Sequence, residues 1–344
     1  MRKLSTILLL LFISEVSFAL KGKDTTVYKN IDTMCIENCR NLLNTRFVIA
    51  GRSNKFSITN YGTKESLEYK INSNTNIGIG LSYKGIGIEF QVSPKFLNRD
   101  DKLYGKSQQF SIATSANSRR FIYDFFLRVN QGFHTTKGTP VPGDTTGAVT
   151  YFYRPDITNT NLGGEFVYVF NNKRFSSSAP YNFTQRQKRS EGSALLGTFF
   201  SLYGINADSV IFPDSLKDRF KPEVQFRRAT TLTSGISYGY TYTFILWKYW
   251  FINLYTLPGL SIHQYYSTNA YSEETKSSVS LGLTFQYRFS IGLNRPKYFF
   301  GISAVGNNYS INNNKSSTLS YQYGSVRAYY GYRFALKKEY LKRM

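Results

Sequence analysis

The sequence has no long hydrophobic run after its first nineteen residues, and this absence restricts how the chain can meet a membrane. No later window holds about eighteen consecutive apolar residues, the length that a helix needs to cross a bilayer. The chain after residue 19 is therefore either soluble or a membrane β-barrel, because only helices and closed barrels satisfy their backbone groups in lipid. The mean hydropathy of −0.33 suits both classes, since only every second residue of a barrel strand faces lipid.

Cysteine is also scarce in the sequence. The two cysteines, Cys35 and Cys39, lie close together before the strand pattern begins. In an oxidising compartment they could form a disulfide. A metal site is the weaker alternative, because it would have only two ligands and no histidine nearby. We expect no metal and no cofactor.

The N-terminus is typical of a cleaved secretory signal peptide over residues 1–19. Arg2 and Lys3 give the positive start, residues 4–13 form a short apolar run, and Ser17 and Ala19 are the small residues before the cut. The apolar run of about ten residues is too short for a spanning helix, which weighs against a retained anchor.

Acidic residues are also few, so the chain carries a large positive charge. Lys and Arg number 43 against 21 Asp and Glu, a formal net charge of +22. Such a balance in the cytoplasm would suggest nucleic acid. The export signal argues against nucleic acid as a partner and favours phosphorylated lipid headgroups and acidic polysaccharides.

A period-two alternation runs from about residue 42 to residue 334 in segments of ten to fifteen residues. The clearest segment is 279–291, where the odd positions are apolar and the even positions are Ser, Gly, Thr, Gln or Arg. Successive strand side chains face opposite sides, so each such segment has one apolar and one polar face. Strands of this length are long for a soluble sandwich and match a tilted bilayer crossing.

The chain is therefore predicted to be all-β, a single transmembrane antiparallel β-barrel over residues 42–334. Residues 20–41 are predicted to be a periplasmic N-terminal segment, and residues 335–344 a short basic tail. About thirteen segments alternate well, whereas bacterial barrels normally have an even number of strands. A strand near residues 209–212 would give fourteen, and removing a weak segment near 175–181 would give twelve. A short turn is predicted at Asn171-Asn172.

Several stretches resemble an uncharacterised family of Bacteroidota outer-membrane proteins, known as domain of unknown function 4421. They include residues 76–88, the Asn-Asn-Lys-Arg-Phe run at 171–175, residues 187–193 and the closing Gly331-Tyr332-Arg333-Phe334. The closing strand also resembles the assembly signal of outer-membrane proteins. The resemblance implies an outer-membrane location, with lipid, lipopolysaccharide and the assembly machinery as partners. It implies no activity.

Two histidines, His134 and His263, are the candidates for catalysis. A hydrolase at the barrel rim would need a histidine, a nucleophilic serine and an orienting acid or amide. His263 has Ser261 nearby, but no acid partner is evident for either histidine. A surface or interfacial histidine is the simpler interpretation.

The phase of alternation places seven charged residues on the inward face, since charges facing lipid are costly. They could line an anion-selective pore or pair with one another as a plug, and their mixed signs favour the plug. The seven are Glu89, Asp124, Glu165, Arg128, Arg288, Arg327 and Arg333.

A basic loop group, Arg186, Lys188 and Arg189 with Lys217, Arg219 and Lys221, could clamp lipid phosphates or simply be solvated. The leading hypothesis is thus a non-enzymatic outer-membrane barrel with a structural, lipid-binding or small-solute role. The alternative is a barrel enzyme acting on membrane lipid or lipopolysaccharide.

Overall fold

The structure, a computed structural model, describes residues 31–60, 65–72, 75–97, 100–137, 139–140, 149–213, 220, 225–269, 271, 274–313 and 317–336. The predicted signal peptide and residues 337–344 of the predicted basic tail lie outside the described residues. No helix in the described part of the chain has the length and apolar character needed to traverse a bilayer. The elements are β1 (Ile36–Asn38), β2 (Leu42–Asn60), β3 (Ser66–Lys70), β4 (Thr75–Tyr83), β5 (Ile86–Val92), the 3-10 turn η1 (Lys95–Leu97), α2 (Asp101–Tyr104), β6 (Gln108–Asn117), β7 (Phe121–Thr135), β8 (Thr139–Pro140), β9 (Val149–Thr150), β10 (Tyr153–Val169), β11 (Gln185–Gln187), β12 (Glu191–Asn206), β13 (Phe226–Leu246), β14 (Trp250–Asn269), β15 (Thr275–Asn294), β16 (Tyr298–Asn313) and β17 (Ser317–Ala335).

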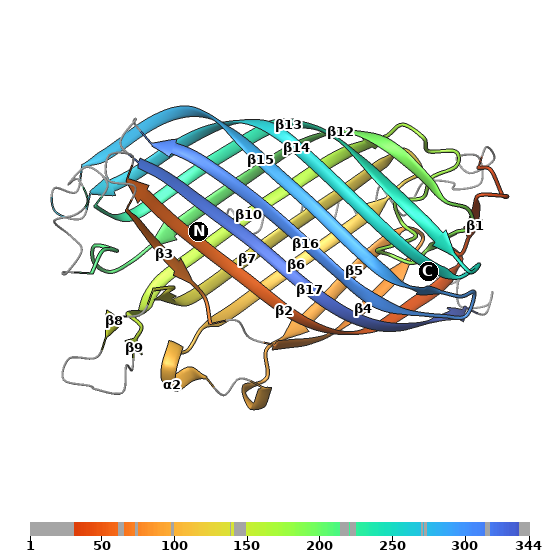
Figure 1. Cartoon of the computed structure of the whole chain (residues 1–344), viewed down its shortest axis with the longest axis horizontal. Coiled ribbons are helices and arrows are strands. Elements are labelled where there is room, and N and C mark those ends of the chain that lie inside the picture. Colours follow the sequence, from red (N-terminus) through yellow and green to blue (C-terminus); the bar gives the residue numbers. More distant parts are fainter. Residues whose placement is uncertain are drawn as a thin grey trace.

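Twelve strands form a closed antiparallel ring (Figure 1). The order is β2, β4, β5, β6, β7, β10, β12, β13, β14, β15, β16 and β17, and β17 pairs back onto β2 from Ala335↔Leu42 to Ser317↔Asn60. Closure leaves no free edge at the junction of the first and last strands. The short β3 pairs with one half of β2 and with two residues of β7, so it completes the wall beyond the end of β4. Of the two strand counts that the sequence left open, twelve is correct.

Both segments that made the count uncertain fold into the barrel instead of forming wall strands. Residues 209–212 form no strand, and Ile211 and Phe212 are buried. Residues 175–181 belong to the long connection 170–190 between β10 and β12, so the predicted short turn at Asn171-Asn172 is wrong. The apolar residues of this connection, such as Phe175, pack inside the barrel, and their burial there explains why the segment resembled a weak strand.

The two ends of the barrel differ in their connections. The end at the right of Figure 1 holds the tight turns at residues 84–85, 118–120, 247–249 and 295–297, together with the start of β2 and the end of β17. We call it the turn end. The opposite loop end carries longer connections, such as residues 93–107 with η1 and α2. Apart from residues 170–190, the connections between wall strands at the turn end are short, and short turns at one end with longer loops at the other are typical of bacterial outer-membrane barrels.

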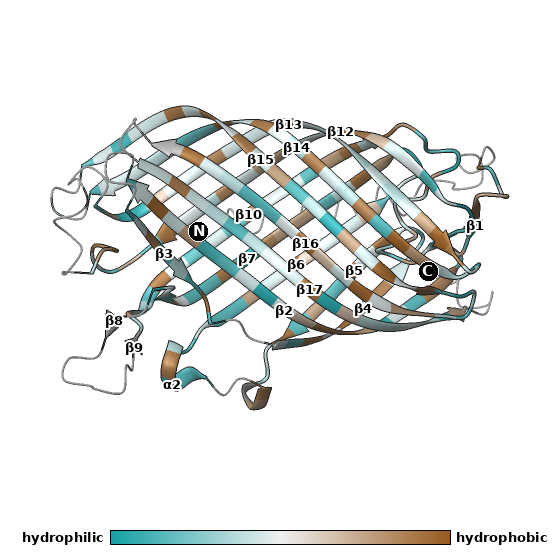
Figure 2. Cartoon of the chain, viewed as in Figure 1, coloured by the Kyte–Doolittle hydropathy of each residue, from teal (hydrophilic) through white to brown (hydrophobic). Residues whose placement is uncertain are grey.

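The outer wall is apolar where it would meet lipid. Along β15 the outward Leu281 and Leu283 are 75% and 69% exposed, whereas the inward Gln286 and Ser290 are buried. The hydropathy colours alternate in the same way along the long strands (Figure 2). A soluble protein would not expose a continuous stripe of large aliphatic side chains around its wall. The barrel is therefore a transmembrane one.

The apolar band reaches the turn end and finishes in an aromatic belt. On β17 the outward residues nearest the turn end are Tyr330, Tyr332 and Phe334, whereas outward Ser320 and Gln322 lie in the loop-end half. Aromatic pairs in this belt include Tyr332–Phe334, Trp250–Phe300 and Tyr168–Phe170. Such belts mark the depth of the headgroups in a membrane. The turn end therefore lies at a membrane interface.

Candidate functional site

The loop end of the lumen is closed by a buried hydrophobic cluster. Phe56, Tyr69 and Phe133 project inward from the wall, and Ile211 and Phe212 fold back from the β12–β13 connection. The Tyr69 hydroxyl donates a hydrogen bond of 2.6 Å to the carbonyl oxygen of Ile211 and so fixes that connection to the wall. Close packing of this kind leaves few voids larger than water.

The turn end is closed by two segments of the chain, residues 31–41 and 170–190, which we call the plug. Pairing of β1 with β11 joins the two segments. Phe183 anchors it, because its buried ring stacks on that of Phe299 with centroids 4.1 Å apart. Arg333 donates hydrogen bonds of 3.1 and 2.9 Å to the carbonyl oxygen of Phe183. The structure thus places Arg333 inside the barrel, where it ties the wall to the plug.

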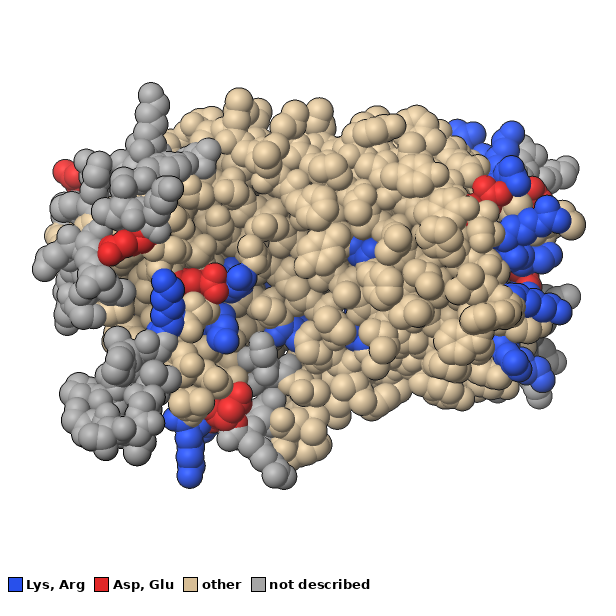
Figure 3. Space-filling view, in the orientation of Figure 1, with Lys and Arg blue, Asp and Glu red and all other residues tan. Residues whose placement is uncertain are grey.

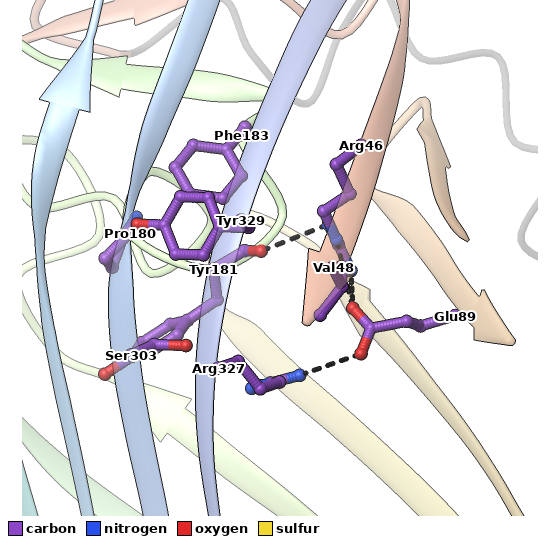
Figure 4. A pocket seen from close by; sticks show the side chains of 9 residues that line it. All are labelled: Arg46, Val48, Glu89, Pro180, Tyr181, Phe183, Ser303, Arg327 and Tyr329. Atoms are coloured by element: carbon purple, nitrogen blue, oxygen red, sulfur yellow. Dashed lines mark hydrogen bonds and ion pairs between the residues drawn. The ribbon is translucent and has the colours of Figure 1, made fainter. Parts of the chain in front are cut away.

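Between these closures lies a layer of paired charges. Arg46 and Arg327 meet Glu89 from two strands that are adjacent to each other, at 2.9 and 3.3 Å (Figure 4). Arg46 also donates a hydrogen bond of 3.3 Å to the carbonyl oxygen of Tyr181 in the plug. Arg46 was not among the residues predicted from the sequence, although it shares the inward phase of Val48 on β2.

A second charged group lies in the same layer. Arg288 pairs with Asp124 at 2.7 Å and also with Glu165. The Tyr181 ring of the plug lies 5.9 Å from the Arg288 guanidinium, and its hydroxyl donates a hydrogen bond of 2.6 Å to Asn253. The plug residue Tyr181 thus contacts both ion-pair groups, and no sequence signal indicated that role.

Arg128 is held differently, because it has no carboxylate partner among the described residues. Its guanidinium lies between two rings, 3.8 Å from the centroid of Phe126 and 3.5 Å from that of Tyr323. Stacking between aromatic faces offsets part of the cost of burying a cation. The arrangement braces the lumen from wall to wall.

Two small cavities lie beside the plug. One is lined by both members of the Arg46–Glu89 pair, and the other by Arg288 and Tyr255, with Tyr181 common to both. Each has room for about one water molecule. In the two ion-pair groups, three arginines balance three carboxylates.

The two histidines lie on different strands, His134 near the end of β7 and His263 within β14. His263 is fully buried in the wall's inner face, with its Nε2 2.9 Å from Ser261 Oγ and its Nδ1 2.8 Å from Thr233 Oγ1. The third member is a threonine, where a hydrolytic triad would have an acid or amide. His134 is also buried, and its ring packs against Tyr104 with centroids 4.7 Å apart. Neither cavity described above is lined by a histidine.

The cysteines lie in the plug as buried free thiols. Cys35 donates a hydrogen bond of 3.3 Å to Asp32, and the backbone N–H of Cys39 donates one to Thr184. Burial raises the pKa of both thiols. No group of three or more His, Cys, Asp or Glu in the described ranges is arranged to hold a metal ion. The Cys35–Cys39 disulfide stays a prediction.

Thiol labelling tests both the burial and the disulfide. We expect a maleimide to modify folded, reduced protein slowly at neutral pH and faster as pH rises, because a raised pKa leaves little thiolate at neutrality. Urea should expose both thiols at once. Rapid labelling of the folded protein would contradict burial in the plug, and labelling in urea that requires prior reduction would establish the disulfide.

Basic side chains gather at the turn end (Figure 3). Each of its tight turns carries Lys or Arg, and the plug adds exposed Lys188 and Arg189. Arg186, from the same predicted group, is buried and pairs with Glu37 at 2.8 Å. Lys217, Arg219 and Lys221 lie outside the described residues. The described basic residues of the tight turns are Lys84, Arg119, Arg120, Lys248, Arg295 and Lys297.

Comparisons with known proteins identify the family. The model of the family described as "Domain of unknown function (DUF4421)" matches residues 30–334. Among solved structures, the outer-membrane protease OmpT from Escherichia coli is similar with a TM-score of 0.41 and 11% identity, over 87% of this chain and 98% of that one. The translocator domain of the autotransporter NalP from Neisseria meningitidis has a TM-score of 0.33 and 8% identity, over 84% and 88%. No curated protein matches the chain.

Proposed function

From its membership of the DUF4421 family, whose description names no activity, and from its sealed lumen, we propose that this chain is a closed, non-enzymatic barrel of a bacterial outer membrane. Its role is structural and lipid-binding. The observation that carries the proposal is the double closure of the lumen, by the plug at one end and by the hydrophobic cluster at the other. A sealed barrel offers its outer wall and its two rims for function.

The direction of insertion follows from the connections. Short turns face the periplasm in bacterial outer-membrane barrels, so the turn end and its plug lie on the periplasmic side. The export signal and the closing strand, whose last aromatic residue is Phe334, agree with insertion by the outer-membrane assembly machinery. The family resemblance supports a Bacteroidota source and contact with lipopolysaccharide at the loop end.

The open-pore alternative is disfavoured by the packed lumen. Eight-stranded barrels fill their interior with side chains and sixteen-stranded barrels leave a channel, so twelve strands could do either. Here the paired charges, the Arg128 stack and the plug occupy the interior. The hydrolase alternative is disfavoured by His263, which is fully buried and lacks an acid partner among the described residues.

Conductance in planar bilayers tests the closed state. We expect no unitary conductance from protein that shows a heat-dependent mobility shift on a cold detergent gel, since that shift demonstrates a folded barrel. The same preparation is used for both measurements, so that silence cannot come from unfolded material. Stable, reproducible channels at low voltage would overturn the proposal in favour of a pore.

A further inference from the structure

Three cations from separate segments converge on one aromatic ring at the turn end. The side chains of Arg186 in β11, Lys248 in the β13–β14 turn and Arg295 in the β15–β16 turn lie 5.2, 5.4 and 5.2 Å from the ring centroid of Tyr249. Two of the elements are neighbouring hairpins, and the backbone N–H of Asn294 donates to the carbonyl oxygen of Tyr249, which holds these hairpins together. The three positive charges are thus fixed in one small region.

This region has more positive charge than its acidic neighbours neutralise. Glu37 accepts two hydrogen bonds from Arg186, which is already its ion-pair partner. Lys248 and Arg295 are exposed, and neither has an ion pair with a described carboxylate. Like charges held together repel, so an anion with several acceptor oxygens would stabilise the group. When no anion is bound, cation–π contacts with the Tyr249 ring hold the cations in place.

The β13–β14 turn, which carries Lys248, has a strained backbone. Trp247 and Lys248, in this three-residue turn, have φ values of 42° and 71°, in the left-handed region that Asn and Gly normally occupy in tight hairpin turns. Non-glycine residues in this conformation cost energy, and they cluster at functional sites. Trp247 is 85% exposed, so the turn keeps a large apolar ring accessible beside the cations.

The neighbouring residues place the region at the depth of lipid headgroups. Trp250 packs edge-on against Phe300, with centroids 5.8 Å apart, in the aromatic belt that ends the apolar wall. Trp and Tyr favour the boundary between hydrocarbon and headgroups, and basic residues just beyond it meet lipid phosphates. A soluble phosphate compound would use the same cations but gain nothing from the exposed tryptophan.

We propose that Arg186, Lys248, Arg295 and Tyr249 form a binding site for the phosphate group of an anionic phospholipid in the leaflet at the turn end. The inference rests on the proposed membrane location. The phosphate oxygens accept hydrogen bonds from Lys248 and Arg295, and Trp247 contacts the upper part of the acyl chains. Arg186 stays paired with Glu37 and contributes its contact with the Tyr249 ring.

Tryptophan fluorescence provides a local probe, because the only two tryptophans of the chain, Trp247 and Trp250, are on this hairpin. The folded full-length mature protein is reconstituted into vesicles of phosphatidylcholine with increasing fractions of dibrominated phosphatidylglycerol or dibrominated phosphatidylcholine. Bromine quenches tryptophan at contact. We expect the brominated anionic lipid to quench at lower mole fraction, with a preference that weakens as salt rises.

The variant Lys248→Gln with Arg295→Gln should lose this preference, by about fivefold for each cation removed. The matched control is Arg119→Gln with Arg120→Gln, which removes the same charge from the β6–β7 turn, separated from the site by β10 and β12. The control should keep the preference. Each variant is first checked for folding by its heat-dependent gel shift.

The other outcomes separate the alternatives. Equal quenching by both lipids, or an equal weakening of the preference in the two double variants, would overturn the site. Displacement of the brominated lipid by millimolar glycerol phosphate would overturn the lipid as ligand in favour of a soluble phosphate ester. If neither brominated lipid quenches, the hairpin is not in the bilayer, and the proposed membrane location itself fails.

Discussion

Replacing Arg288 with methionine is expected to lower the free energy of unfolding by about 3–5 kcal/mol, the usual cost of removing one partner from a buried ion pair. Asp124 and Glu165 both depend on this guanidinium, and the Glu165 side chain is only 8% exposed. Without Arg288, two carboxylates would share a closed space with no cation between them. The destabilisation is measured as a shift of the urea midpoint, followed by the heat-dependent gel mobility of the reconstituted barrel.

A triple variant separates charge from packing at this position. Arg288→Met combined with Asp124→Asn and Glu165→Gln removes all three charges at once and should recover most of the stability, since buried ion pairs can be replaced by neutral groups at little cost. If the triple variant is as unstable as the single one, the destabilisation arises from packing of the long side chain. A single variant as stable as the natural chain would show that the pair carries no stabilising role.

Replacing Phe183 with alanine is expected to release the plug while the barrel wall stays intact. Truncating a buried Phe side chain to alanine costs about 3–5 kcal/mol, and in this variant the stack on the Phe299 ring is removed. The residue has a φ of 58°, but alanine keeps the same backbone conformation, so the substitution mainly removes the packing of the ring. A cost of about 3 kcal/mol raises the open population about a hundredfold.

Maleimide labelling of Cys39 in the folded protein measures this opening, because Cys39 is hydrogen-bonded to Thr184 beside the anchor. The expected result is a large rise in labelling rate with an unchanged gel shift. Phe170→Ala is the matched control, since Phe170 begins the same connection but is 51% exposed, and it should leave the rate nearly unchanged. Similar labelling rates in the natural chain and Phe183→Ala would mean that the stack does not hold the plug.

Local alternation carried most of the information about the wall. Residues 279–291 alternate strictly, and β15 has its outward and inward faces in that phase. The phase can be read from the sequence, because successive side chains of a strand face opposite sides whichever strands lie beside it. For the same reason, Glu89 and Arg288 could be assigned to the inward face before any partner was known.

The count of strands could not be read in the same way. A buried apolar segment inside a lumen and a weak wall strand look alike over a few residues, as residues 175–181 and 209–212 demonstrate. Only the closure of β17 onto β2 fixes which segments belong to the ring. Hydrophobicity reports burial, and it does not report what the residue is buried against.

The sequence by itself therefore determined an all-β chain with a lipid-facing side and a polar inner side that carries charged residues. The tertiary structure decided the partners: Arg327 meets Glu89 across 238 positions of chain, and Arg186 approaches Tyr249 from a different segment. Alternation is a property of one strand, whereas an ion pair, a plug or a cation cluster depends on which strands barrel closure brings together. The sealed lumen and the proposed Tyr249 site both depend on which strands barrel closure brings together.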